Sequence, residues 1–119
     1  MAEEVLGDTE LAPERAAELI AEGATVIDVR RADEWDGGRL AGARHIEMNE
    51  LTAAADSIPR DRPVLFYCRG GNRSAMAAEA FREAGFDAYN MAGGLQAWAD
   101  EGRPLDPEDG EVRTPPPPS

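Results

Sequence analysis

The sequence contains no lysine, one cysteine and one histidine, and each scarcity excludes a class of protein. All twelve basic residues are arginine, and 24 acidic residues bring the net charge to −12. Nucleic acid is therefore not an expected partner, because phosphate binding needs clustered positive charge. One cysteine cannot form an internal disulfide. One histidine without partners at zinc-ligand spacing makes a metal site unexpected.

Long apolar runs are also missing. No stretch approaches the ~20 apolar residues that cross a bilayer, and the N-terminus carries Glu3 and Glu4 where a secretion signal would be basic. We therefore expect no membrane association. A reactive thiol without a disulfide partner requires a reducing compartment, so we expect a cytoplasmic protein.

Composition divides the chain of 119 residues into one domain and two ends. Residues 8–107 hold the apolar runs and are long enough to bury one core. Residues 1–7 are expected to be a flexible N-terminus. Residues 108–119, which combine charges with four consecutive prolines, are expected to form a disordered tail. A short polyproline ligand is the less favoured interpretation of this tail.

Within the domain, predicted strands alternate with predicted helices. Apolar and β-branched runs predict strands at residues 24–29, 44–46, 64–67 and 86–91. Helical patterns cover residues 13–22, 49–56 (capped by Asn49), 73–84 (burying Ala77, Ala80, Phe81 and Ala84) and 94–101, with a helical turn at 32–35. This alternation predicts a three-layer α/β fold, with a parallel sheet between two layers of helices. Ligands of such sheets bind beyond the carboxyl ends of the strands.

The most informative segment is residues 68–74, Cys-Arg-Gly-Gly-Asn-Arg-Ser, which directly follows the predicted strand at 64–67. Its two glycines allow backbone amides to turn inward, and the following helix adds its positive dipole end. Arg69 and Arg73 supply charge and donors suited to an oxyanion. A lone cysteine is usually a buried hydrophobe, but these surroundings favour a thiolate, so we interpret Cys68 as a nucleophile. The residues expected to bind the substrate are Arg69, Gly70, Gly71, Asn72, Arg73 and Ser74.

Four segments of the chain follow a known order and spacing. Residues 25–30 (TVIDVR) have the pattern of a strand ending in Asp-x-Arg, and residues 38–46 (GRLAGARHI) follow the pattern GHIPGAxxI. The cysteine loop comes next, and residues 92–98 (AGGLQAW) follow the pattern AGGxxAW. Together, across residues 8–107, these segments resemble the single-domain rhodaneses, a family of sulfurtransferases. Arg39 and Ala41 depart from the family's usual histidine and proline, outside the active loop.

The resemblance implies a rhodanese-like fold with a five-stranded, mainly parallel sheet. It also implies that Cys68 carries a persulfide, with thiosulfate or a related persulfide as a small anionic sulfur donor and with no cofactor. Cyanide, an external thiol or a sulfur-acceptor protein would then remove the sulfur. The acceptor must come from outside, because the chain has no second cysteine.

Four further residues are expected to support the loop. Asp28 and Arg30 could pair as a structural bridge beneath it, a role that the family resemblance favours over direct catalysis. Gly93 and Gly94 are expected to allow close backbone approach beside it.

Two other functions remain open at this point. Cysteine phosphatases and arsenate reductases place five residues between cysteine and arginine, whereas Cys68 and Arg73 enclose four. Tyr67 also stands where tyrosine phosphatases carry histidine. A non-catalytic binding module with the same fold is the other alternative, and the intact cysteine and arginines count against it.

Three isolated residues have structural interpretations. We expect His45 to have a structural role within its strand. Trp98 is expected to pack in the core rather than bind substrate. Glu34 is expected to lie on the solvated surface.

Overall fold

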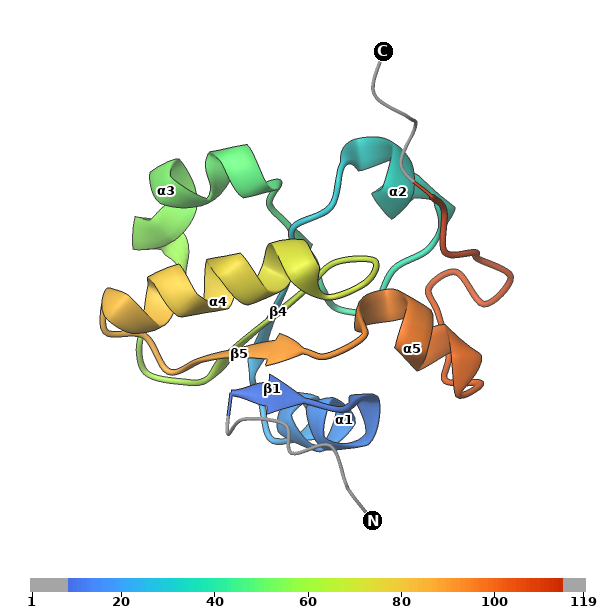
Figure 1. Ribbon diagram of the computed structural model, residues 1–119, viewed down its shortest axis with the longest axis horizontal. Coiled ribbons are helices and arrows are strands. Elements are labelled where there is room, and N and C mark those ends of the chain that lie inside the picture. Colours follow the sequence, from blue (N-terminus) through green and yellow to red (C-terminus); the bar gives the residue numbers. More distant parts are fainter. Residues whose placement is uncertain (1–8, 115–119) are drawn as a thin grey trace.

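The computed structural model describes residues 9–114 and has three layers, with a parallel sheet between two layers of helices (Figure 1). The strands are β1 (Glu10–Leu11), β2 (Thr25–Asp28), β3 (Arg44–His45), β4 (Val64–Tyr67) and β5 (Ala88–Met91). Their order across the sheet is β1-β5-β4-β2-β3, and every neighbouring pair is parallel. The predicted five-stranded parallel sheet is therefore confirmed, with β4 at its centre.

Helices cover both faces of this sheet. They are α1 (Pro13–Ala21), α2 (Ala32–Gly37), α3 (Leu51–Ala54), α4 (Asn72–Glu83) and α5 (Gly94–Asp100). Helices α1 and α5 share one apolar cluster with Leu65 and Tyr67 of β4. Helices α3 and α4 share the other with Val64, Phe66 and Cys68. Alternate residues of β4 thus face opposite layers, as the two-residue period of a strand requires. Among residues 9–114, no helix is long and apolar enough to cross a membrane.

Two helices differ from their prediction. The helix expected from Asn49 is a short α3 between two 3₁₀ turns, Met48–Glu50 and Ala55–Ser57, and the Asn49 side chain does not cap it. The buried side of α4 is formed by Ser74, Ala77, Ala78 and Phe81, whereas Ala80 and Ala84 are exposed. The reason is register: α4 turns Ser74 inward toward Cys68, and the buried stripe continues from there at helical spacing.

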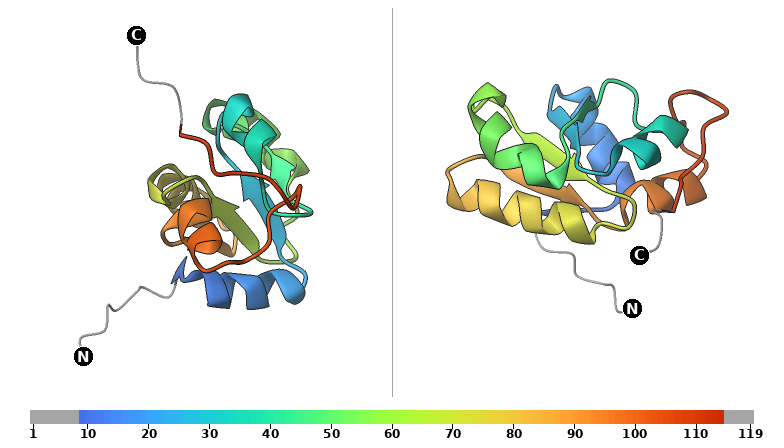
Figure 2. Two further views of the ribbon diagram at one scale, coloured as in Figure 1. Left: turned by 90° about the vertical axis from the view of Figure 1, so that its right-hand side faces the viewer. Right: turned by 90° about the horizontal axis from the view of Figure 1, so that it is seen from above.

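The C-terminal segment extends the domain beyond residue 107. The Glu111 amide donates to the Gly37 carbonyl at 2.8 Å, and Arg113 Nη1 donates to the Asp33 carbonyl at 3.1 Å. Val112 packs against the cluster shared by α1 and α5. Residues 108–114, expected in a disordered tail, therefore lie along α2 (Figure 2), which corrects that boundary. The expected flexible N-terminus and the four prolines fall outside the described residues.

The isolated histidine and tryptophan both have structural contacts. His45 Nε2 lies 2.6 Å from the Arg30 carbonyl oxygen, and its ring stacks on Trp35 with centroids 4.8 Å apart. Trp98 is buried and donates its Nε1–H to the Pro104 carbonyl at 2.8 Å. These contacts agree with the roles expected for both residues.

Candidate active site

The thiol of Cys68 lies at the carboxyl end of β4, where the chain turns into α4. All four residues of β4 are buried, and Cys68 itself is 1% exposed. Its Sγ accepts hydrogen bonds from the Gly71 amide at 3.1 Å and from the Ser74 hydroxyl at 3.3 Å. Two donors directed at one sulfur can stabilise negative charge that develops on it, or on a second sulfur attached to it.

Only one of the two loop glycines has a left-handed backbone. Gly71 has a φ of 99°, whereas Gly70 has no positive φ, and a Cβ at Gly70 would meet no atom within 4 Å. The expectation that both glycines turn the chain is thus met at Gly71 alone. From Gly71 the chain enters α4, whose first-turn amides at Asn72 and Arg73 have no partner within the helix.

The Gly93–Gly94 turn at the start of α5 supports the cysteine loop. This loop lies beside the start of α5 (Figure 1). The amides of Leu95 and Gln96 donate to the carbonyls of Cys68 and Arg69, at 2.8 and 3.0 Å. A Cβ on Gly94 would lie 2.5 Å from both of these carbonyl oxygens, and its φ is 61°. The close backbone approach expected here is therefore present, and it requires glycine.

A cavity of about 310 Å³ opens in front of the thiol, lined by Cys68, Arg69, Gly70, Asn72 and Arg73. This size suits a small ligand. Arg69 is half-buried there, and within the part of the chain that the structure describes its guanidinium has no hydrogen-bonded partner. Across residues 9–114, no group of three histidine, cysteine or acidic side chains is placed to hold a metal ion.

Arg73 is not free in the same way, because Glu34 of α2 holds it. Its two terminal nitrogens donate to the two carboxylate oxygens of Glu34, each at 2.9 Å. The Glu34 side chain is 0% exposed and that of Arg73 33% exposed, so the expectation of a solvated Glu34 is wrong. Burial opposes ionisation of Glu34, but hydrogen bonds from Arg73 and the Arg31 amide outweigh it and lower the pKa of the carboxyl.

The structural pair expected between Asp28 and Arg30 is present. Both side chains are 0% exposed, and Arg30 Nη2 lies 2.7 Å from Asp28 Oδ2. Burial disfavours the Arg30 charge, yet the hydrogen bonds and charge of Asp28 leave its pKa raised. Arg30 Nη2 also donates to the Gly38 carbonyl, and its guanidinium lies 5.7 Å from the ring centre of Tyr67. The pair thus fixes the end of β2 beside the residue that precedes Cys68.

Asn90 is a site residue that the sequence reasoning missed. It is 1% exposed, and its Nδ2 donates to the Gly71 carbonyl at 3.1 Å and to Glu10 Oε1 at 2.8 Å. Asn90 therefore fixes the carbonyl of Gly71, the residue whose own amide donates to the Cys68 sulfur. The available signal was an amide side chain inside a predicted buried strand that ends at the same edge of the sheet as β4.

Comparison with known proteins agrees with this arrangement. The family described as rhodanese-like domain matches residues 12–101. The thiosulfate sulfurtransferase GlpE of Pseudomonas aeruginosa (strain LESB58) is 34% identical over 103 residues, which cover 86% of this chain and 93% of GlpE. The uncharacterized protein YqhL of Bacillus subtilis (strain 168) is 40% identical over 76 residues, 63% of this chain and 60% of YqhL.

Solved structures share the fold. A rhodanese-related protein from Thermoplasma volcanium has a TM-score of 0.76 and 32% identity, covering 81% of this chain and 95% of that one. A protein from Rhodopseudomonas palustris described as a possible tyrosine phosphatase has a TM-score of 0.72 and 25% identity, covering 88% and 98%. The family match covers most of the chain, GlpE is similar over nearly its whole length, and the cysteine loop lies at the end of β4. This chain therefore belongs to the rhodanese-like domain family.

Proposed function

We propose that this protein transfers sulfane sulfur from thiosulfate, or a related persulfide donor, through a persulfide on Cys68. The observation that carries the proposal is the Cys68 sulfur, which accepts hydrogen bonds from the Gly71 amide and the Ser74 hydroxyl beside a small cavity. Arg69 supplies a cation at the same opening. This arrangement suits a cysteine that alternates between a thiolate and a persulfide, both of which carry a negative charge on sulfur.

In the first step the Cys68 thiolate attacks the outer sulfur of thiosulfate. A new S–S bond forms, the bond between the outer and central sulfur atoms breaks, and its electron pair leaves with sulfite. The Cys68 persulfide remains, with its negative charge on the outer sulfur. The loop amides and the Ser74 hydroxyl stabilise this anion because they are already oriented toward it.

In the second step cyanide, or an external thiol of a small molecule or a sulfur-acceptor protein, attacks the outer sulfur. The Cys68 thiolate then leaves with the electron pair of the persulfide bond. The acceptor comes from outside because Cys68 is the only cysteine of the chain. A thiolate cycle of this kind fits a reducing compartment, and we assign the protein to the cytoplasm on that ground.

A phosphatase reaction is the main alternative, given the Rhodopseudomonas palustris neighbour described as a possible tyrosine phosphatase. Two features count against it. Cys68 and Arg73 enclose four residues rather than five, and both terminal nitrogens of Arg73 already bond Glu34. Arg73, the arginine at the end of the loop, is therefore already engaged and is not fully available to a phosphate ester.

The proposal is tested by thiocyanate formation from thiosulfate and cyanide. Native protein should show ping-pong kinetics, because sulfur leaves one substrate before the other reacts. Cys68→Ser should fold with a similar melting temperature and form no thiocyanate above background. Native-like turnover by Cys68→Ser would overturn the persulfide route.

A further inference from the structure

The pocket around Cys68 contains little uncompensated positive charge, although two arginines line it. Arg73 is paired with Glu34 through two hydrogen bonds. The nearby Arg30 is paired with Asp28 in the same manner. Of these three arginines, Arg69 alone has no carboxylate partner among residues 9–114. When Cys68 is a thiolate, the charge of Arg69 is balanced as well, and the site as a whole is neutral.

The surroundings add negative rather than positive charge. Glu10 accepts a hydrogen bond from Asn90, whose amide also bonds the Gly71 carbonyl of the loop. Glu10 is therefore one side chain away from the active loop. The whole chain carries a net charge of −12. A donor with two negative charges consequently finds a matching cation for one of them at most.

We propose that Glu34 determines which donors the site uses: by neutralising Arg73, it favours sulfane donors with one negative charge over donors with two. This inference rests on the proposed sulfur transfer and narrows its substrate class. Organic thiosulfonates and organic persulfides belong to the favoured class. Thiosulfate, a dianion, belongs to the disfavoured one.

Methanethiosulfonate and thiosulfate make a matched pair of donors. In each, the Cys68 thiolate forms an S–S bond to the terminal sulfur, and the bond from that sulfur to the oxidised sulfur breaks. The electron pair leaves on methanesulfinate in one case and on sulfite in the other. The same persulfide results, so the two reactions differ in the charge of the donor and leaving group. Intrinsic reactivity cancels when variants are compared by the ratio of kcat/KM for thiosulfate to that for methanethiosulfonate.

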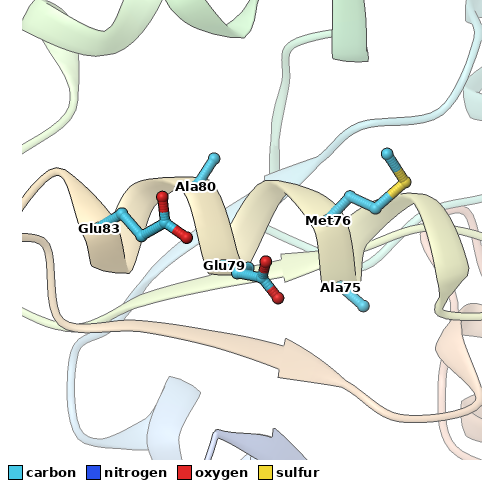
Figure 3. Close-up of a pocket in the computed structure, with 5 residues that line it drawn as sticks. All are labelled: Ala75, Met76, Glu79, Ala80 and Glu83. Carbon is cyan, nitrogen blue, oxygen red and sulfur yellow. The ribbon is translucent and has the colours of Figure 1, made fainter.

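Glu34→Gln is the decisive variant, because glutamine keeps an acceptor for Arg73 and removes one negative charge. For charges roughly 7 Å apart in a partly aqueous site, the ratio should rise about three- to eight-fold at low salt. Glu83→Gln is the control, since it changes the net charge equally at the far end of α4. Figure 3 shows Glu83 on the surface of this helix, beyond Glu79 and away from Met76. The ratio of the control should equal that of native protein, and an unchanged ratio in Glu34→Gln would overturn the inference.

A double variant, Glu34→Gln with Arg73→Gln, tests the same claim in a second way. It removes both charges of the pair and leaves two amides that can bond each other. If Glu34 cancels Arg73, the donor ratio should stay at its native value. A fall of the ratio by several-fold would mean that Arg73 acts as an uncompensated cation, and would overturn the inference. Failure of native protein to accept sulfur from either donor would instead contradict the proposed function.

Discussion

Glu34 and Arg73 lie 39 positions apart in the sequence and form a two-pronged ion pair at the edge of the active loop, with both N–O distances 2.9 Å. Glu34 comes from α2 and is fully buried, whereas Arg73 is the second residue of α4. The pair therefore ties the loop that carries Cys68 to α2, the helix that follows β2 in the chain. It also distinguishes the two arginines of the loop: Arg73 is paired, whereas Arg69 has no hydrogen-bonded partner among residues 9–114.

This separation predicts different effects for the two arginines. Arg69→Ala should change the free energy of unfolding by no more than about 0.5 kcal/mol, because Arg69 has no described partner. It should reduce the use of an anionic donor about tenfold or more, since a charge-assisted hydrogen bond contributes roughly 1.5–3 kcal/mol. Thiocyanate kinetics and urea unfolding measure both quantities.

Arg73→Ala should behave in the opposite manner with respect to stability. It leaves the carboxylate of Glu34 buried without its main donor, and an unsatisfied buried acceptor destabilises a fold by about 1–3 kcal/mol. Urea unfolding of this variant beside Arg69→Ala makes the comparison. Equal stability of the two variants would be inconsistent with a structural pair between Arg73 and Glu34.

The ion pair also predicts a pH dependence of stability. The pKa of Glu34 is lowered in the folded protein from its ordinary value of 4.5, so folding favours the charged carboxylate. The resulting stabilisation is fully present above pH 4.5, and is lost as the pH falls through the lower pKa of the folded state. Native protein should therefore keep its full advantage over Glu34→Gln down to about pH 4.5, and should lose that advantage as the pH falls further.

Urea unfolding at several pH values tests this expectation, with Glu83→Gln as the control for removal of an exposed carboxylate. The difference between native protein and Glu34→Gln should be largest at pH 7. A difference that stays constant down to pH 3 would show that Glu34 contributes by packing alone.

Substitution of Gly94 by alanine should reduce sulfur-transfer activity by more than backbone strain alone explains. Gly94→Ala and Gly102→Ala both place a side chain on a left-handed backbone, with φ values of 61° and 77°. Each should be destabilised by about 1–2 kcal/mol for that reason. Only at Gly94 would the new Cβ meet the carbonyl oxygens of Cys68 and Arg69, whereas at Gly102 it meets open space.

Gly94→Ala should therefore displace the active loop. A displacement of about 1 Å can reduce a rate on the order of a hundredfold, while Gly102→Ala should keep nearly native turnover per folded molecule. Parallel measurements of unfolding and thiocyanate formation separate the two effects. Similar turnover in both variants would contradict the role of Gly94 in supporting the loop.

Local sequence patterns predicted much of the fold and the centre of the site. The apolar run of β4, the cysteine loop and the helix formers of α4 are contiguous, so their order alone places a thiol at a helix start. The partner of Arg73 could not be predicted this way, because Glu34 lies in a polar segment typical of a surface helix. The burial of Glu34 depends on how α2 packs against the loop and helix that follow β4, which lie more than 30 positions later in the sequence.

The C-terminal boundary illustrates the same limit. Residues 108–114 are polar and contain little apolar side-chain surface, which is typical of a tail. They are held by the Glu111 amide on the Gly37 carbonyl, by Arg113 on the Asp33 carbonyl and by the packing of Val112, and composition contains no signal for the two hydrogen bonds. Gly110 lies so close to Gly37 and Gly38 that a Cβ would be 2.9 Å from the Gly37 carbonyl oxygen.

The most direct test of the account is the intact mass of the native chain after incubation with a sulfane donor and removal of the excess. Because Cys68 is the only cysteine, the account predicts the added mass of one sulfur atom, its loss on treatment with cyanide, and no addition to Cys68→Ser. A chain that gains no sulfur from thiosulfate or from methanethiosulfonate, or that gains it equally as Cys68→Ser, would contradict the claim that Cys68 carries sulfur.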